Sequence, residues 1–328
     1  MTPGGGLADL IDRGDLDELV RTADRLTDAA DWDGLVELRD RSRTALERGR
    51  QLWPVASLAE YRLALCAPGP WAGAVIREGA GRFALGPLPE VVASTHAWEE
   101  LAAHVPDGPL RAVTAHERVV RGEDLRDAGR VPEGIIDLPL APQPWEPTYP
   151  LASYEPEKAD FPIEPVTLPR SEALPAPGSP IADLRAATSL RDLVTPWTSE
   201  SNGRCEVTAV RGDGPAAVAA LGPRRARIAP VDAADALARM AWAGASGGAH
   251  GRRRGMAVGR FAAWWALAAL ADLGDDWPVT PDELGAAAAE LRWWLWDAGE
   301  PELGWALRVA VDDPAHGLAW AVAATDDS

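Results

Sequence analysis

A proline-rich segment from Val131 to Pro180 divides this sequence into three parts. Thirteen of its 50 residues are proline, and because proline lacks a backbone N–H and has a fixed φ, neither a long helix nor a central strand can form there. Four aromatic residues lie among the prolines, which is unusual for a disordered segment. They are Trp145, Tyr149, Tyr154 and Phe161. We therefore expect an extended, largely polyproline-like arm, residues 131–180, between two folded domains, residues 1–130 and 181–328.

This arm has two alternative docking surfaces. Its apolar and aromatic residues can pack on the chain's own domains, or the four aromatic side chains can form an interaction arm that holds a partner protein. PxxP spacings such as Pro139 to Pro142 occur in the segment. So many prolines produce these spacings by chance, and both interpretations stay open.

The sequence before the arm predicts an array of helices. From Leu7 to about Arg121 apolar residues recur at helical spacing, with glycine or proline at each junction. His96, His104 and His116 fall in these helices, but no HxxxH or ExxH pair recurs. We therefore predict no metal site and expect the three histidines at the surface or at helix caps.

The sequence after the arm mixes helical and strand periods. Residues alternate as in strands at 204–209 and 225–228, and two further runs at 305–311 and 318–324 are joined by the turn sequence DDPAHG, which predicts a terminal hairpin. Predicted helices span residues 181–194, 233–243, 256–273 and 281–298. The last of these starts with Thr280 as cap and Pro281 at the first position, and it would end at Gly299. The fold class is α+β, mostly α: a helical array, the arm, and a mixed C-terminal domain with a helical core and a few antiparallel strands.

One stretch of the C-terminal domain carries an excess of positive charge. Residues 221–260 hold eight arginines against two aspartates, a net charge of +6, whereas the whole chain carries −18 and the remainder therefore −24. Such a basic region meets either an anionic ligand or the protein's own acidic surface. The arginines are Arg224, Arg225, Arg227, Arg239, Arg252, Arg253, Arg254 and Arg260.

The glycine- and arginine-rich loop at residues 244–254 is the candidate anion-binding site in this region. It precedes a predicted helix start, where free backbone N–H groups and the helix dipole attract anions, and arginine side chains would add paired donors. The candidate residues are Gly247, Gly248, His250, Arg252, Arg253, Arg254 and Arg260. The loop matches neither GxxxxGK[ST] nor GxGxxG. Alternatively, Gly251, Gly255 and Gly259 share one helix face and allow close helix packing, with arginines paired internally.

No other pattern in the chain predicts catalysis. The two cysteines, Cys66 and Cys205, have no CxxC spacing and no predicted base nearby, so we expect inert thiols, no disulfide and no cofactor. The acidic balance, with a pI of about 4.7, makes nucleic acid an unlikely partner. No signal peptide or span of membrane length is recognisable, so we expect no membrane partner and a soluble, cytoplasmic protein.

Two functions follow from these observations. The first is a non-enzymatic protein-interaction or assembly protein, which holds a protein partner or forms a homo-oligomer. The alternative is a binder or enzyme that acts on a phosphate-bearing small molecule at the loop 244–254.

Overall fold

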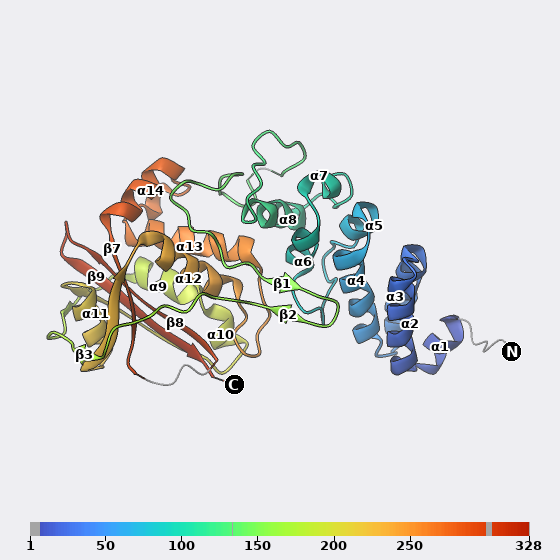
Figure 1. Ribbon diagram of the computed structural model, residues 1–328, viewed down its shortest axis with the longest axis horizontal. Coiled ribbons are helices and arrows are strands. Elements are labelled where there is room, and N and C mark those ends of the chain that lie inside the picture. The colour runs from blue at the N-terminus through green and yellow to red at the C-terminus, as the bar shows by residue number, and fades with distance from the viewer. Residues whose placement is uncertain (1–6, 133, 300–303, 328) are drawn as a thin grey trace. The chain divides into compact units, whose positions relative to one another are not determined.

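A computed structural model describes residues 7–132, 134–299 and 304–327 of the chain. The fold is α+β and mostly α-helical, as the sequence predicts (Figure 1). The chain forms two compact units. The first contains residues 1–119, 124–135 and 152–161, and the second contains residues 120–123, 136–151 and 162–328. The proline-rich arm therefore contributes residues to both units.

The first unit is an array of helices with one small hairpin. Asp15 and Asp31 cap α2 and α3 by accepting hydrogen bonds from backbone N–H groups three residues further on. Helix α4 is buried along most of its length, and α2, α3 and α6 pack against it. The elements are α1 (Leu7–Arg13), α2 (Leu16–Asp28), α3 (Trp32–Glu47), α4 (Trp53–Cys66), α5 (Gly69–Ala74), α6 (Leu88–Thr95), α7 (Trp98–Leu101), α8 (Pro109–Val119), β1 (Ser153–Tyr154) and β2 (Ala159–Asp160).

One of the three histidines of this unit does not lie where the sequence predicts. His96 is the C-cap residue of α6 but is buried, and its Nε2 lies 2.8 Å from the carbonyl oxygen of Ala67. His116 on α8 is also buried, whereas His104 is exposed. The expectation of a surface or cap position was wrong for His116, which is buried within α8 (Pro109–Val119). Among the described residues, no three His, Cys, Asp or Glu side chains are grouped to hold a metal ion.

The second unit combines a seven-stranded sheet with helices. Its elements are β3 (Glu172–Ala173), β4 (Ser179–Pro180), α9 (Leu184–Asp192), α10 (Thr195–Ser199), β5 (Arg204–Arg211), α11 (Gly214–Ala220), β6 (Arg225–Val231), α12 (Ala233–Ala245), α13 (Met256–Leu270), η1 (Gly274–Asp276), α14 (Pro281–Glu290), β7 (Arg292–Asp297), β8 (Trp305–Asp313) and β9 (Leu318–Asp326). The predicted terminal hairpin is present as β8 and β9. Across the described residues, no helix of either unit is long and apolar enough to cross a membrane.

The sheet is antiparallel, with strand order β3-β6-β7-β8-β9-β5-β4. Alternate residues of each strand point to opposite faces. One face packs on the main core with α9, α12, α13 and α14, as Figure 1 shows. The other face carries a smaller core around Val218 of the short helix α11. The second face is thus covered over only part of its area.

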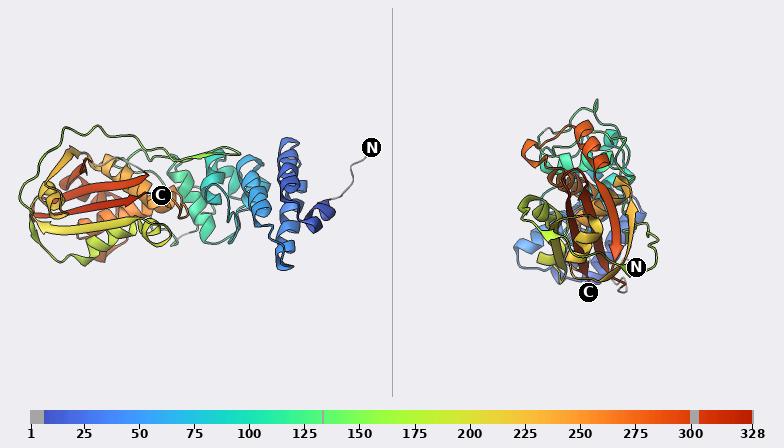
Figure 2. Two further views of the ribbon diagram at one scale, coloured as in Figure 1. Left: turned by 90° about the horizontal axis from the view of Figure 1, so that it is seen from below. Right: turned by 90° about the vertical axis from the view of Figure 1, so that its left-hand side faces the viewer.

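The arm occupies both edges of the sheet. After it enters the second unit at Pro162, its residues 172–173 pair with β6 as β3, and its residues 179–180 pair with β5 as β4. Figure 2 shows this returning part of the arm as extended chain along the outside of the sheet. Pro180 fits this position because proline is tolerated on an edge strand. Of the two alternatives for the arm, the structure therefore shows the first: the arm packs on its own chain.

The predicted helix over residues 281–298 is wrong in its second half. The Thr280 cap and Pro281 start are as predicted, but α14 ends at Glu290 and residues 292–297 form β7. Trp293 and Leu295 face the main core, while Trp294 and Trp296 face the smaller core around α11. The tryptophan run therefore has the period of two of a strand that is covered on both faces. A single helix face could not hold all of these rings, because they pack into two different cores on opposite faces of the sheet.

Helices α12 and α13 pack closely through glycine. A Cβ added at Gly259 would lie 2.1 Å from the carbonyl oxygen of Ala241, so no larger residue fits between the two backbones. The expectation that Gly251, Gly255 and Gly259 share a helix face was wrong, because α13 begins at Met256 and Gly255, with φ of 97°, is its N-cap. Of these three glycines, Gly259 serves the close approach, where it lies against Gly244 of α12.

Substitution Gly259→Ala should destabilise the second unit. The new methyl group forces α12 and α13 apart, which we expect to lower the free energy of unfolding by about 1–3 kcal/mol. Urea denaturation followed by tryptophan fluorescence measures this change. The control is Gly129→Ala, where an added Cβ meets nothing within 4 Å and the change should stay within about 0.5 kcal/mol. Equal stabilities of the two variants would contradict the close packing.

Candidate functional site

The predicted anion-binding loop connects α12 to α13 and is folded against its own chain. Gly247 is buried, and a Cβ there would lie 2.1 Å from the carbonyl oxygen of Gly251. Gly248 has φ of +71°, and a Cβ there would lie 2.1 Å from Oδ2 of Asp326. The glycines thus serve a tight turn over a carboxylate that belongs to the protein.

The backbone donors of this loop are already bonded to acids of the second unit. The amide of Ala249 donates to Oδ2 of Asp326 at 2.6 Å. The amide of Arg252 donates to Oε2 of Glu200 at 3.0 Å. Asp326 is fully buried at the end of β9 and also accepts from the Ser201 hydroxyl at 2.9 Å. At these two amides, carboxylates of the chain itself are bound where the predicted site would bind an external anion.

The loop's charged side chains differ in exposure. His250 and Arg252 are exposed, whereas Arg253 and Arg254 are half-buried. Arg254 Nε donates to the carbonyl oxygen of Gly244 at 2.8 Å, and its Nη2 donates to that of Leu193 at 3.0 Å. Burial lowers the pKa of Arg254 from its usual value. This guanidinium caps the C-terminal ends of α12 and α9, because it donates to backbone carbonyl groups there.

Arg260 lies apart from the loop, inside the second unit. Its side chain is fully buried on α13 and forms an ion pair with Glu146 of the arm at 2.8 Å, whose side chain is 2% exposed. It also donates to the carbonyl oxygens of Pro139 and Ala141 at 2.9 and 3.3 Å. Its guanidinium lies over the ring of Trp264, 5.2 Å from the centroid. These hydrogen bonds all go to the arm, so the Arg260 side chain anchors the arm to α13.

The four aromatic residues of the predicted interaction arm also contact their own units. Trp145 packs against Trp264 with ring centroids 4.8 Å apart, and its Nε1 donates to the carbonyl oxygen of Pro281 at 2.9 Å. Tyr149 is buried in the same core. In the first unit, Tyr154 is buried, donates to Glu90 at 2.6 Å, and meets Phe161 edge to face at 6.2 Å. These rings hold the arm in place.

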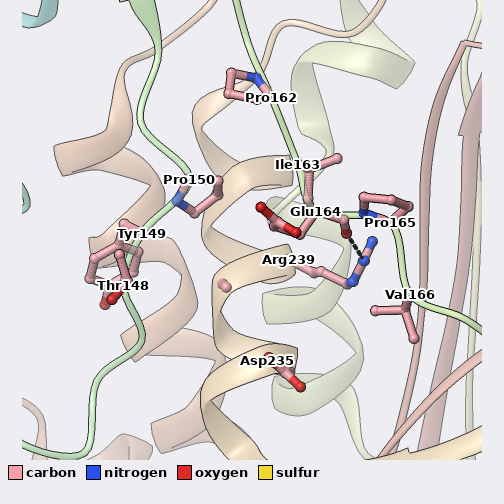
Figure 3. A pocket seen from close by; sticks show the side chains of 11 residues that line it. Thr148, Tyr149, Pro150, Pro162, Ile163, Glu164, Pro165, Val166, Asp235 and Arg239 are labelled. Atoms are coloured by element: carbon pink, nitrogen blue, oxygen red, sulfur yellow. Dashed lines mark hydrogen bonds between the residues drawn. The ribbon is translucent and has the colours of Figure 1, made fainter.

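A groove lies where two passes of the arm cross α12, and we call it the arm groove. Its volume is about 510 Å³, within the range typical of ligand sites. Proline, isoleucine, valine and alanine form most of its walls, so it is largely apolar (Figure 3). The lining residues are Thr148, Tyr149, Pro150, Pro162, Ile163, Glu164, Pro165, Val166, Asp235, Ala238 and Arg239.

Three charged residues border the arm groove. Arg239 donates to the backbone carbonyl oxygen of Glu164, which fixes the returning pass of the arm on α12 (Figure 3). The carboxylates of Glu164 and Asp235 are exposed and make no hydrogen bond or ion pair with any residue that the structure describes. The groove thus presents apolar walls with two exposed carboxylates and one guanidinium, a net charge of −1.

Sequence reasoning missed the arm groove and the acids behind the loop. Ile163, Glu164 and Val166 belong to the arm, but no pattern in the sequence places them beside α12. Asp326 and Glu200 lie 77 and 52 residues from their partners in the loop. No spacing rule connects positions so far apart, and the charge balance does not reveal these contacts because their donors are backbone amides.

The thiol of Cys205 does not have the properties of a nucleophile. Burial raises its pKa to about 11. Burial also raises the pKa of Cys66. Because the thiolate is the reactive form, both thiols are mostly protonated at neutral pH.

The chain combines a helical array with an antiparallel sheet that has helices on both faces. An extended arm of the same chain covers both edges of this sheet. The chain belongs to a family of unknown function, DUF6183, whose model matches residues 17–328. No protein of curated function and no solved structure matches the chain significantly.

Removal of the buried cation should release the arm. In Arg260→Met, Glu146 remains buried without its partner, which we expect to cost about 3–5 kcal/mol of unfolding free energy. Adding Glu146→Leu should recover part of this loss because no buried charge then remains. The control Arg185→Met removes the exposed ion pair with Asp275 and should cost less than about 1 kcal/mol. Equal losses in the two single variants would contradict the anchoring role.

The buried thiol should react slowly with alkylating agents. In the single-thiol variant Cys66→Ser, the rate of reaction of Cys205 with iodoacetamide should rise about tenfold per pH unit from pH 7 to 10 without a plateau. The urea-unfolded chain serves as control, and its rate should level off above the ordinary thiol pKa of about 8.5. A plateau below pH 9 in the folded protein would contradict the raised pKa.

Proposed function

We propose that this chain is a non-enzymatic, cytoplasmic protein-interaction protein and that the arm groove binds a segment of a partner protein. The observation that carries the proposal is the composition of the groove: apolar walls made by two passes of an anchored arm, with the free carboxylates of Glu164 and Asp235 at the rim. A surface that is already ordered loses little conformational entropy when a partner binds.

The chemistry of the groove favours one kind of partner segment. Its apolar walls suit an aliphatic or aromatic side chain, and its rim suits an adjacent lysine or arginine, whose charge the two carboxylates complement. The net charge of −18 on the chain also attracts basic partners over longer distances. We therefore propose a partner segment in which an apolar residue lies next to a basic one.

The anion site at the loop 244–254 stays a prediction and does not carry this proposal. The loop's amides at Ala249 and Arg252 are bonded to Asp326 and Glu200, and an external anion would have to displace them. Opening the loop in this way would leave a buried carboxylate without its donors, which is costly.

A peptide selection on the purified chain tests the proposed function. Random peptides displayed on phage should be enriched in sequences that carry an apolar residue beside lysine or arginine. Synthetic peptides of this kind should bind Ala238→Gln at least tenfold more weakly, measured by fluorescence polarisation, because the larger side chain fills the groove. The control Ala234→Gln, one helical turn earlier on α12, should bind them as the wild type does.

Three outcomes would count against this function. Selected peptides without basic residues would contradict the role of the rim, and equal affinity for Ala238→Gln would place binding elsewhere. If light scattering shows an oligomer that Ala238→Gln dissociates, the groove holds a second copy of the chain rather than a different protein.

A further inference from the structure

The partly covered face of the sheet contains a second hollow, which we call the sheet hollow. Helix α11 has only seven residues, and its core with the sheet lies near the end of β5, around Val210. Towards the start of β5 and the end of β9 the same face is open, and a hollow of about 530 Å³ lies there. Its lining residues are Arg204, Glu206, Leu221, Pro223, Arg224, Arg225, Trp296, Ala298, Arg308, Ala323 and Thr325.

Strand register explains why this region is hollow. Arg204 of β5 pairs with Thr325 of β9, and Arg308 of β8 pairs with Ala323 of β9. Paired residues project to the same face of a sheet, so the small side chains of the central strand lie between long side chains of its two neighbours. The short residues form the floor, and the arginines form the walls.

The walls of the sheet hollow are strongly basic. Four arginines and a single glutamate line it, a net charge of +3 in a chain whose total is −18. Arg204 and Arg224 are exposed and make no ion pair with any residue in the described ranges. Arg225 donates to the carbonyl oxygen of Ser171 at 2.6 Å. This acceptor is neutral, and Arg225 forms no ion pair with an acidic side chain of the described residues. Clustered guanidinium groups repel one another unless an anion lies between them.

A buried tryptophan provides a second, independent observation. Trp296 lines the sheet hollow and is 5% exposed, and its indole Nε1 has no hydrogen-bond acceptor among the described residues. Arg308 lies over this ring, 6.0 Å from the centroid. A buried donor without an acceptor costs free energy. A residue that lines the hollow therefore carries a buried donor with no acceptor among the described residues.

We propose that the sheet hollow binds a small phosphate-bearing molecule. Several guanidinium groups around one cavity match an anion with many oxygens, because each planar guanidinium donates two parallel hydrogen bonds to phosphate. The cavity has the size of a small-molecule site. A single basic hollow in an acidic chain does not provide the extended cationic face that a nucleic acid requires. This site is separate from both the arm groove and the loop 244–254.

Isothermal titration with inorganic pyrophosphate tests this site. The full chain should bind one pyrophosphate with saturation at low ionic strength, and salt should weaken the binding. The double variant Arg204→Gln/Arg224→Gln should bind at least tenfold more weakly, and these exposed substitutions leave the fold intact. The control Arg170→Gln/Arg211→Gln removes the same charge elsewhere, since Arg211 is on β5 but outside the hollow, and should bind as the wild type does.

Each contrary result has a definite meaning. Absence of saturable binding by the wild type overturns the site. An equal loss in both double variants shows that pyrophosphate responds to the overall charge and not to the hollow. An oligonucleotide that binds but is not displaced by pyrophosphate identifies a nucleic-acid surface instead. Because peptide binding at the arm groove is measured separately, failure here leaves the proposed interaction function unaffected.

Discussion

The second unit depends on one buried ion pair. Arg260 has no access to water, and a guanidinium in that position is tolerable only if each of its donors has a partner. Glu146 and two carbonyl groups of the arm supply these partners. The pair therefore determines the path of the arm across α13, which in turn brings Trp145 onto Trp264. The arm groove exists because this path is fixed.

Arginine has three different roles in the basic region of the sequence. On α13 one arginine is an internal anchor, and in the loop Arg254 closes helix ends. Just before β6, Arg224 remains exposed beside the sheet hollow. The net charge of a window averages over such roles, because it depends on residue type and not on the direction of the side chain. The charge count identifies the region as basic, but only the folded structure shows which of its arginines are buried, which cap helices and which are exposed.

Local patterns in the sequence predicted local structure. Aspartate caps, the Thr280 start and the turn sequence before β9 act within a few residues, so the helical array, α12 and the terminal hairpin were foreseeable. Contacts between distant residues were not. The pairing of Asp326 with the loop and the assignment of Trp293 to Trp296 to a strand both depend on which surfaces meet in the folded chain. The aromatic residues of the arm indicate an ordered segment, but only the folded structure shows that they pack on their own chain.

The position of the arm in the chain has a consequence for biosynthesis. Residues 172–180 leave the ribosome before β5 to β9, so the segments that become β3 and β4 are already present when the outer strands β6 and β5 appear. A newly made strand with free backbone groups is a template for pairing with another chain. Here the complementary segment is covalently attached and precedes each strand that it protects. The outer edge of each of these two strands therefore has its partner segment available as soon as the strand is synthesised.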